Sequence, residues 1–169
     1  MNTTTSDFER LQLAVDAAGV GTWDLNVPTG ELIWSAHCKA IFGLPPTAEV
    51  TYADFLEGVH PDDRAATDAA VQSAFDPAGP GTYDVEYRTR WRENGPTQWA
   101  RATGRAFFNE DRTQALRFIG TITDVTEYKS MIERITTAYE DLETKVIFRT
   151  LELEQELRQL RGERTGLTP

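Results

Sequence analysis

Residues 118–129, Phe-Ile-Gly-Thr-Ile-Thr-Asp-Val-Thr-Glu-Tyr-Lys, mark the point at which the pattern of the sequence changes. The β-branched residues at its start alternate as they do in a half-buried strand. After it, apolar residues recur every three or four positions for about thirty-five residues, which is the spacing of a helix. We therefore expect a compact domain that ends here and a long helix that follows it.

Three alternating runs predict long strands over residues 83–91, 98–108 and 116–125. Asn94-Gly95 is a strong turn signal between the first two runs. An earlier hairpin is predicted from residues 22–27 and 31–34, which flank a turn at 28–30. Short connections between consecutive strands indicate antiparallel pairing, so these runs predict one antiparallel sheet of five strands.

The run 98–108 has a face of small residues and an opposite face of large ones. The small face carries Ala100, Ala102, Gly104 and Ala106, whereas Trp99, Arg101, Thr103, Arg105 and Phe107 lie opposite. Small residues allow the close approach of either a helix or a small ligand, and both remain open at this point. On the outer face we expect cross-strand charge pairs among Glu86, Arg88, Arg101 and Arg105.

Helix-start signals place the helices before and between the strands. Ser6-Asp7-Phe8-Glu9 is a capping box that predicts an amphipathic helix over residues 7–18, either a packing lid or part of a dimer interface. Ser35 is expected to cap a short helix that Gly43 ends. A helical turn is expected at 52–56, and Pro61 with two aspartates predicts a helix to about residue 75.

The composition excludes several classes of protein. The chain has 169 residues and a net charge of −10, which disfavours a nucleic-acid or anionic-membrane surface. No apolar run approaches the length of a membrane span, and the N-terminal residues lack the pattern of a signal peptide. These features predict a cytoplasmic protein. The length suits one α+β domain and an extension: a tail and helix at 1–19, a core at 20–126, a helix at 127–161 and a flexible tail at 162–169.

Seven short motifs in order resemble a PAS domain with its C-terminal PAC segment, of the branch that carries a His-Pro-Asp-Asp motif. The motifs lie at residues 21–25, 34–35, 41–45, 59–64, 83–88, 99–102 and 120–127. The resemblance covers roughly residues 8–128. It implies a PAS fold, in which a five-stranded antiparallel sheet has the spatial order 2-1-5-4-3 and helices cross one face. It also implies a sensory or dimerising role in signalling proteins.

The expected long helix carries a coiled-coil pattern. Its apolar seam consists of Ile132, Ile135, Tyr139, Leu142, Val146, Leu153, Leu157 and Leu160. Arg149 occupies the seam position between Val146 and Leu153, and the step from Leu153 to Leu157 departs from the strict heptad, which weakens the register. The seam predicts a parallel homodimer with two domains side by side at one end.

Residues 142–153 resemble the connector helix that joins PAS domains to histidine kinases, and similar connectors precede cyclic-dinucleotide enzymes. The sequence has no phosphoacceptor histidine downstream and no ATP-binding motif. We therefore expect this chain to have no catalytic activity and to act on a downstream effector, most simply a histidine kinase in a two-component system.

A ligand pocket is predicted between the sheet and the helices. Its candidate residues are Trp34, Phe42, Tyr87, Ala102, Gly104 and Gly120. The four tryptophans, Trp23, Trp34, Trp91 and Trp99, are interpreted as core residues, with a flavin or aromatic-ligand pocket as the alternative. No cofactor is predicted from the residues themselves, although a flavin- or haem-binding photoreceptor or redox sensor remains the alternative function.

The two histidines and the cysteine are interpreted as structural residues. His60 precedes Pro61 and is expected to start a helix, and His37 is expected to be solvated or packed. Cys38 is expected to be a half-buried thiol, because its Ala-His-Cys-Lys context differs from the Asn-Cys-Arg motif of light-sensing PAS domains. We predict no metal site.

Asp124 and Thr126 are the predicted signal-relay residues at the junction. Either side chain can accept a hydrogen bond from the free amides at the start of the outgoing helix. Arg149 is the third relay residue, because a charge in the seam keeps alternative registers close in energy. The sequence thus predicts a sensory module that dimerises and relays a conformational change through its last helix.

Overall fold

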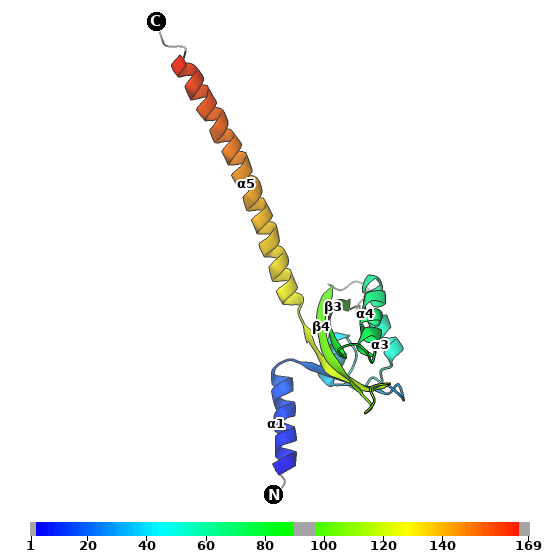
Figure 1. Cartoon of the computed structure of the whole chain (residues 1–169). Helices are drawn as coiled ribbons and strands as arrows, with labels where there is room; N and C mark the ends of the chain where they lie inside the picture. Colours follow the sequence, from blue (N-terminus) through cyan, green and yellow to red (C-terminus); the bar gives the residue numbers. More distant parts are fainter. Residues whose placement is uncertain (1–2, 90–96, 166–169) are drawn as a thin grey trace. The chain divides into compact units, whose positions relative to one another are not determined.

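The computed structural model describes residues 3–89 and 97–165 (Figure 1). The chain divides into two compact units, Met1–Thr126 and Glu127–Pro169, each of which is described by itself. Trp91 and the turn signal Asn94-Gly95 lie outside the described residues.

The first unit is built on one antiparallel sheet of five strands in the order β2-β1-β5-β4-β3, as the resemblance implies. Its strands are β1 (Gly21–Asn26), β2 (Leu32–Trp34), β3 (Thr82–Thr89), β4 (Gln98–Phe108) and β5 (Ala115–Asp124). The predicted early hairpin is confirmed, with Trp23 opposite Trp34 and Gly30 at a φ of 75° in the turn. The chain therefore has the predicted α+β class.

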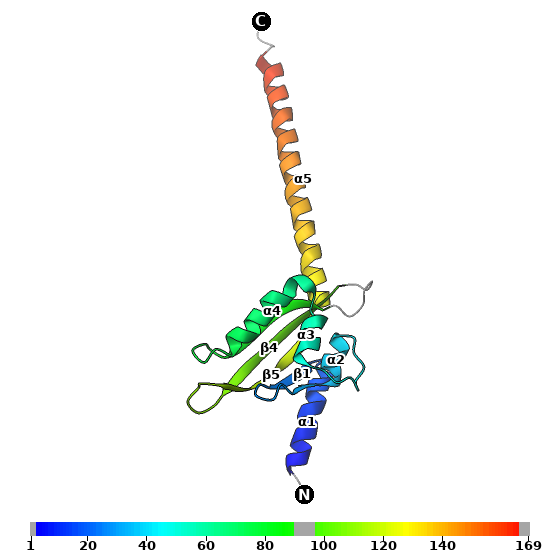
Figure 2. The same ribbon diagram turned by 90° about the vertical axis from the view of Figure 1, so that its right-hand side faces the viewer.

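Three helices cross one face of the sheet: α2 (Ala36–Ile41), α3 (Tyr52–Gly58) and α4 (Pro61–Ala74) (Figure 2). Ser35 caps α2 as predicted, because its side chain accepts a hydrogen bond from the Cys38 amide. Pro61 occupies the first turn of α4. Thr51 and Asp54 form a complete capping box at α3, a Thr-x-x-Asp signal that the sequence interpretation overlooked.

The N-terminal helix α1 spans Thr3–Ala17 and begins four residues earlier than predicted. Gly19 follows it with a φ of 65°, the left-handed conformation that commonly ends a helix. The side chains of Leu11 and Leu13 are exposed. Neither of these two residues therefore packs as part of a lid.

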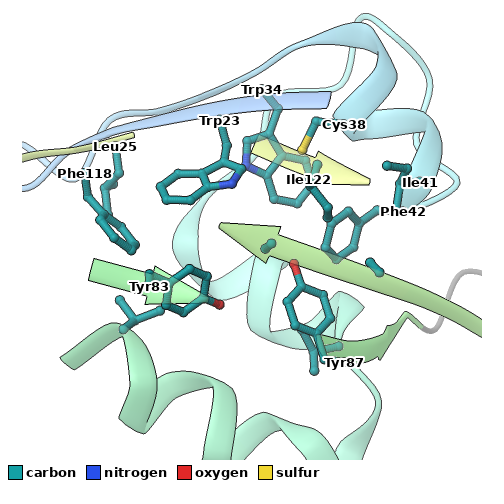
Figure 3. Close-up of a cluster of buried hydrophobic side chains, with 14 of the residues drawn as sticks. Trp23, Leu25, Trp34, Cys38, Ile41, Phe42, Tyr83, Tyr87, Phe118 and Ile122 are labelled. Atoms are coloured by element: carbon teal, nitrogen blue, oxygen red, sulfur yellow. The ribbon is translucent and has the colours of Figure 1, made fainter. Parts of the chain in front are cut away.

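The alternation predicted for the long strands separates a buried face from an outer one. Ala100, Ala102 and Ala106 of β4 are buried with Tyr83 and Tyr87 of β3. Phe118 and Ile122 of β5 join the same core, together with Trp23 and Trp34 of the first hairpin (Figure 3). Trp99 points to the outer face and is only partly buried, so the interpretation of all four tryptophans as core residues is wrong for this one.

The second unit is the helix α5, which as a whole spans Thr126–Thr165. Its 40 residues correspond to a length of about 60 Å at 1.5 Å per residue. Over the described parts of the chain, no helix combines the length and the apolar character that a membrane span requires.

Candidate functional site

A small cavity of about 40 Å³ lies in the core between the sheet and the helices. All five strands except β4 contribute large side chains to its wall, and the rest come from α2, α3 and α4. The lining residues are Trp23, Leu25, Leu32, Trp34, Cys38, Phe42, Tyr52, Phe55, Val71, Tyr83, Tyr87, Ala102, Phe118 and Ile122. The wall is thus predominantly apolar and aromatic, as is usual for ligand pockets in proteins.

Four of the six residues proposed for a pocket lie together in this wall: Trp34, Phe42, Tyr87 and Ala102. Gly104 and Gly120 do not line the cavity. A side chain at either glycine would meet the indole ring of Trp23, which packs directly on both strands. At Gly104 the small face of β4 therefore accommodates Trp23, whereas Ala102 of the same face lines the cavity.

The cavity wall contains four groups that could exchange protons, one thiol and three tyrosine hydroxyls, and all four are held neutral. Burial raises the pKa of the Cys38 thiol to about 12 and raises the pKa of Tyr83 and of Tyr87. Cys38 is only 1% exposed, so it is fully buried rather than half-buried as predicted. A protonated, enclosed thiol is a poor nucleophile. The arrangement consequently favours binding over covalent chemistry.

One polar atom in the wall has no hydrogen-bond partner within the protein, the buried hydroxyl of Tyr83. The hydroxyls of Tyr83 and Tyr87 both point toward the interior of the cluster (Figure 3). Buried polar groups in proteins are nearly always hydrogen-bonded, so an unpaired hydroxyl in a cavity wall indicates a position for a polar atom of a small guest.

Tyr52 closes the wall at the helix side. Its hydroxyl donates to Asp68 Oδ1 at 2.7 Å, which joins α3 to α4. Burial and this neighbouring carboxylate raise the pKa of Tyr52. The hydrogen bond holds the Tyr52 ring in place at the cavity.

The cavity does not fit a flavin or a haem. Pockets for drug-sized ligands have volumes of about 300–1,000 Å³, far more than the 40 Å³ here. Neither histidine lies in the wall: the His60 side chain accepts from the Asp62 amide at the start of α4, as predicted for a helix-start residue, and His37 lies near Gly19. A guest of a few non-hydrogen atoms matches the space.

The junction residues Asp124 and Thr126 are joined by hydrogen bonds. Asp124 Oδ1 accepts from the Thr126 amide at 2.8 Å, so the carboxylate satisfies one free donor at the start of α5. Thr126 Oγ1 accepts from the Trp99 amide at 2.9 Å. The Val125 amide donates to the Trp99 carbonyl at 2.8 Å. Hydrogen bonds to Trp99 therefore hold Val125 and Thr126, at the start of α5, to β4.

The side chains of the proposed seam lie on α5 and are exposed in the single chain. Their exposed fractions run from 44% at Ile132 to 63% at Tyr139. Arg149 donates to Glu152 at 3.0 Å, a pair within the helix in which both side chains remain mostly exposed.

The charged residues of the outer face pair with partners that the sequence did not predict. Arg101 pairs with Asp84, which is a strand neighbour, but Arg88 pairs with Asp63 of α4. The prediction of a cross-strand pair is therefore wrong for Arg88. Alternation identifies the outer face, whereas the partner comes from a helix 25 residues away in the chain.

A model of the family described as PAS fold matches residues 31–122. The sensor protein FixL of Bradyrhizobium diazoefficiens is 30% identical over 123 residues, which cover 73% of this chain and 24% of FixL. A blue-light-activated histidine kinase of Brucella anthropi is 34% identical over 121 residues, which cover 72% of this chain and 23% of the relative.

A crystal structure of a sensory box histidine kinase/response regulator from Burkholderia thailandensis is also similar. Its sequence is 36% identical and its TM-score is 0.65, and the match covers 79% of this chain and 98% of that one. The chain spans about a quarter of the length of the curated relatives that it matches. The family model covers more than half of this chain. The chain belongs to the PAS fold family.

Proposed function

We propose that this chain is the sensory input module of a sensor histidine kinase, and that it dimerises through α5 and passes a conformational bias to a downstream effector. The relatives named above are sensor proteins and histidine kinases, which supports this effector over a cyclic-dinucleotide enzyme. The whole protein would supply the kinase activity. The expectation that it acts in the cytoplasm, away from nucleic acid, stays a prediction from composition and charge.

The observation that carries the proposal is the exposed apolar seam of α5. Eight apolar or aromatic residues at coiled-coil spacing are between 44% and 63% exposed. Fully burying one such side chain contributes about 1.5–3 kcal/mol, so a second copy that covers the seam would offset the entropy lost on association. A partner helix with the same seam is the simplest cover, because an a/d stripe is self-complementary.

The cavity is the proposed site of sensing. Its apolar wall and neutral tyrosine and cysteine groups favour a small, uncharged molecule that offers one acceptor to the Tyr83 hydroxyl. An ionic ligand is disfavoured, because the wall contains no charged residue to compensate for its desolvation. The small volume does not favour the flavin- or haem-bound alternative.

The dimer is tested by sedimentation equilibrium on two matched variants. Leu142→Asp places a charge in the seam, whereas Leu151→Asp places the same charge at a similarly exposed residue outside it, 51% against 57% exposed. We expect the first variant to be monomeric and the second to dimerise like the unchanged protein. Equal dissociation constants for both variants, or an unchanged protein that is monomeric at all concentrations, would overturn the proposal.

A further inference from the structure

We infer that Arg88 is a positioning residue that couples the helix over the cavity, α4, to the first residues of α5. We call the chain of contacting residues Asp63, Arg88, Trp99 and Thr126 the bridge. None of these four residues lines the cavity or belongs to the seam of α5. The inference rests on the proposed function only in taking α5 as the output.

The first part of the bridge joins α4 to β3. The Asp63 carboxylate accepts three hydrogen bonds from Arg88: from its backbone amide at 2.9 Å, from Nε at 2.9 Å and from Nη2 at 2.7 Å. The Arg88 carbonyl in turn accepts from the His60 amide at 2.8 Å. The start of α4 therefore cannot shift without moving Arg88 or breaking several bonds at once.

The second part joins β3 to the start of α5. The guanidinium of Arg88 lies over the ring of Trp99, with its carbon 5.8 Å from the ring centroid, and the two residues are opposite each other in the sheet. Such a contact attracts a cation to an aromatic face. The backbone of Trp99 then holds Val125 and Thr126 by hydrogen bonds on both its amide and its carbonyl.

The far end of α4 reaches the cavity. Val71 is 2% exposed and lines the wall, and it lies two turns along the same helix from Asp63. A guest that displaces Val71 would move a rigid helix of 14 residues whose first turn is held by Arg88. The bridge thus forms a continuous path of contacts from the cavity wall to Thr126.

If the salt bridge between Arg88 and Asp63 had a purely local role, its removal would destabilise only α4 and β3. The chain offers a matched control in Arg117, which pairs with Asp24 through Nε and Nη2 on the same outer face but has no contact with Trp99 or Thr126 among the described interactions. A comparison of the two arginines separates the loss of a surface ion pair from the loss of the coupling.

The experiment is hydrogen exchange on the full chain, read at the amides of Val125 and Thr126. We expect Arg88→Gln and Asp63→Asn to speed exchange there about tenfold, the change expected when one charge-assisted contact is lost. Arg88→Lys should rescue little, because an ammonium lacks the planar fork. Arg117→Gln should leave both amides unchanged. The amides of β1 should stay unchanged in the Arg88 and Asp63 variants.

Non-additivity provides the second criterion. Thr126→Val removes the hydroxyl that accepts the hydrogen bond from the Trp99 amide. If both residues act on one path, the double variant with Arg88→Gln should exchange little faster than either single variant. Full additivity, or equal effects of Arg88→Gln and Arg117→Gln, would overturn the inference. These amides lie inside the domain, so a monomeric protein would refute the proposed dimer and leave this result interpretable.

Discussion

Ile122 and Ile132 are ten residues apart, yet the first is 1% exposed and the second 44% exposed. Ile122 lies in the core between the sheet and the helices of the first unit, whereas Ile132 lies on the single helix of the second unit. The same residue type therefore stabilises the domain core in one place and, under the proposed function, a dimer in the other. The contrast motivates the proposal that α5 pairs with a second helix.

The largest expected effect tests this contrast directly. Ile122→Ala should lower the free energy of unfolding by about 2–5 kcal/mol, because it leaves a cavity in a closed core. Ile132→Ala should change the unfolding of the domain by less than about 0.5 kcal/mol in dilute solution. Thermal melts at several protein concentrations distinguish the two. Equal losses would mean that α5 packs on its own domain.

A smaller effect is expected at Arg149. Arg149→Leu removes a charge from the seam and should strengthen the dimer at least about tenfold, since a buried leucine contributes about 1.5–3 kcal/mol. The same change should hold the helices in one register. Sedimentation measures the dissociation constant, and an unchanged value would show that Arg149 does not face a partner.

The smallest expected effect is on the pH dependence of the melting temperature, through Asp63, which pairs with Arg88 of the outer face. The hydrogen bonds from Arg88 hold the pKa of Asp63 below its ordinary value of 3.8. The folded state thus favours the ionised carboxyl, and its contribution is complete above the unfolded value and is lost as pH falls through the folded one. Asp63→Asn should therefore reduce the fall in melting temperature between about pH 5 and pH 3.

The acid prediction has an internal control. Hydrogen bonds also lower the pKa of Asp54 and of Asp84, so the variant should reduce the acid sensitivity without abolishing it. Neither of these carboxyls contacts Arg88. A melting temperature that falls by the same amount in Asp63→Asn and in the unchanged protein would contradict the assignment.

Much of the fold could be predicted from sequence because alternation and helix caps are local signals. The run 98–108 identified β4 and its buried face, and Ser35 and Pro61 marked the starts of two helices. Less of the candidate site could be predicted. Tyr83 stood on a predicted buried face, but nothing local indicated that its hydroxyl would face a cavity without a partner.

The sequence by itself determined the order of the elements, the face that each buries and the apolar seam of α5, because residues a few positions apart encode each of these. Only the tertiary structure decided that Trp23 would lie on Gly104 and Gly120, and that Arg88 would bind Asp63. The period of the apolar residues predicts which face of a helix or strand is buried. The identity of the covering residue depends on how distant elements pack, and that is set by the closed core as a whole.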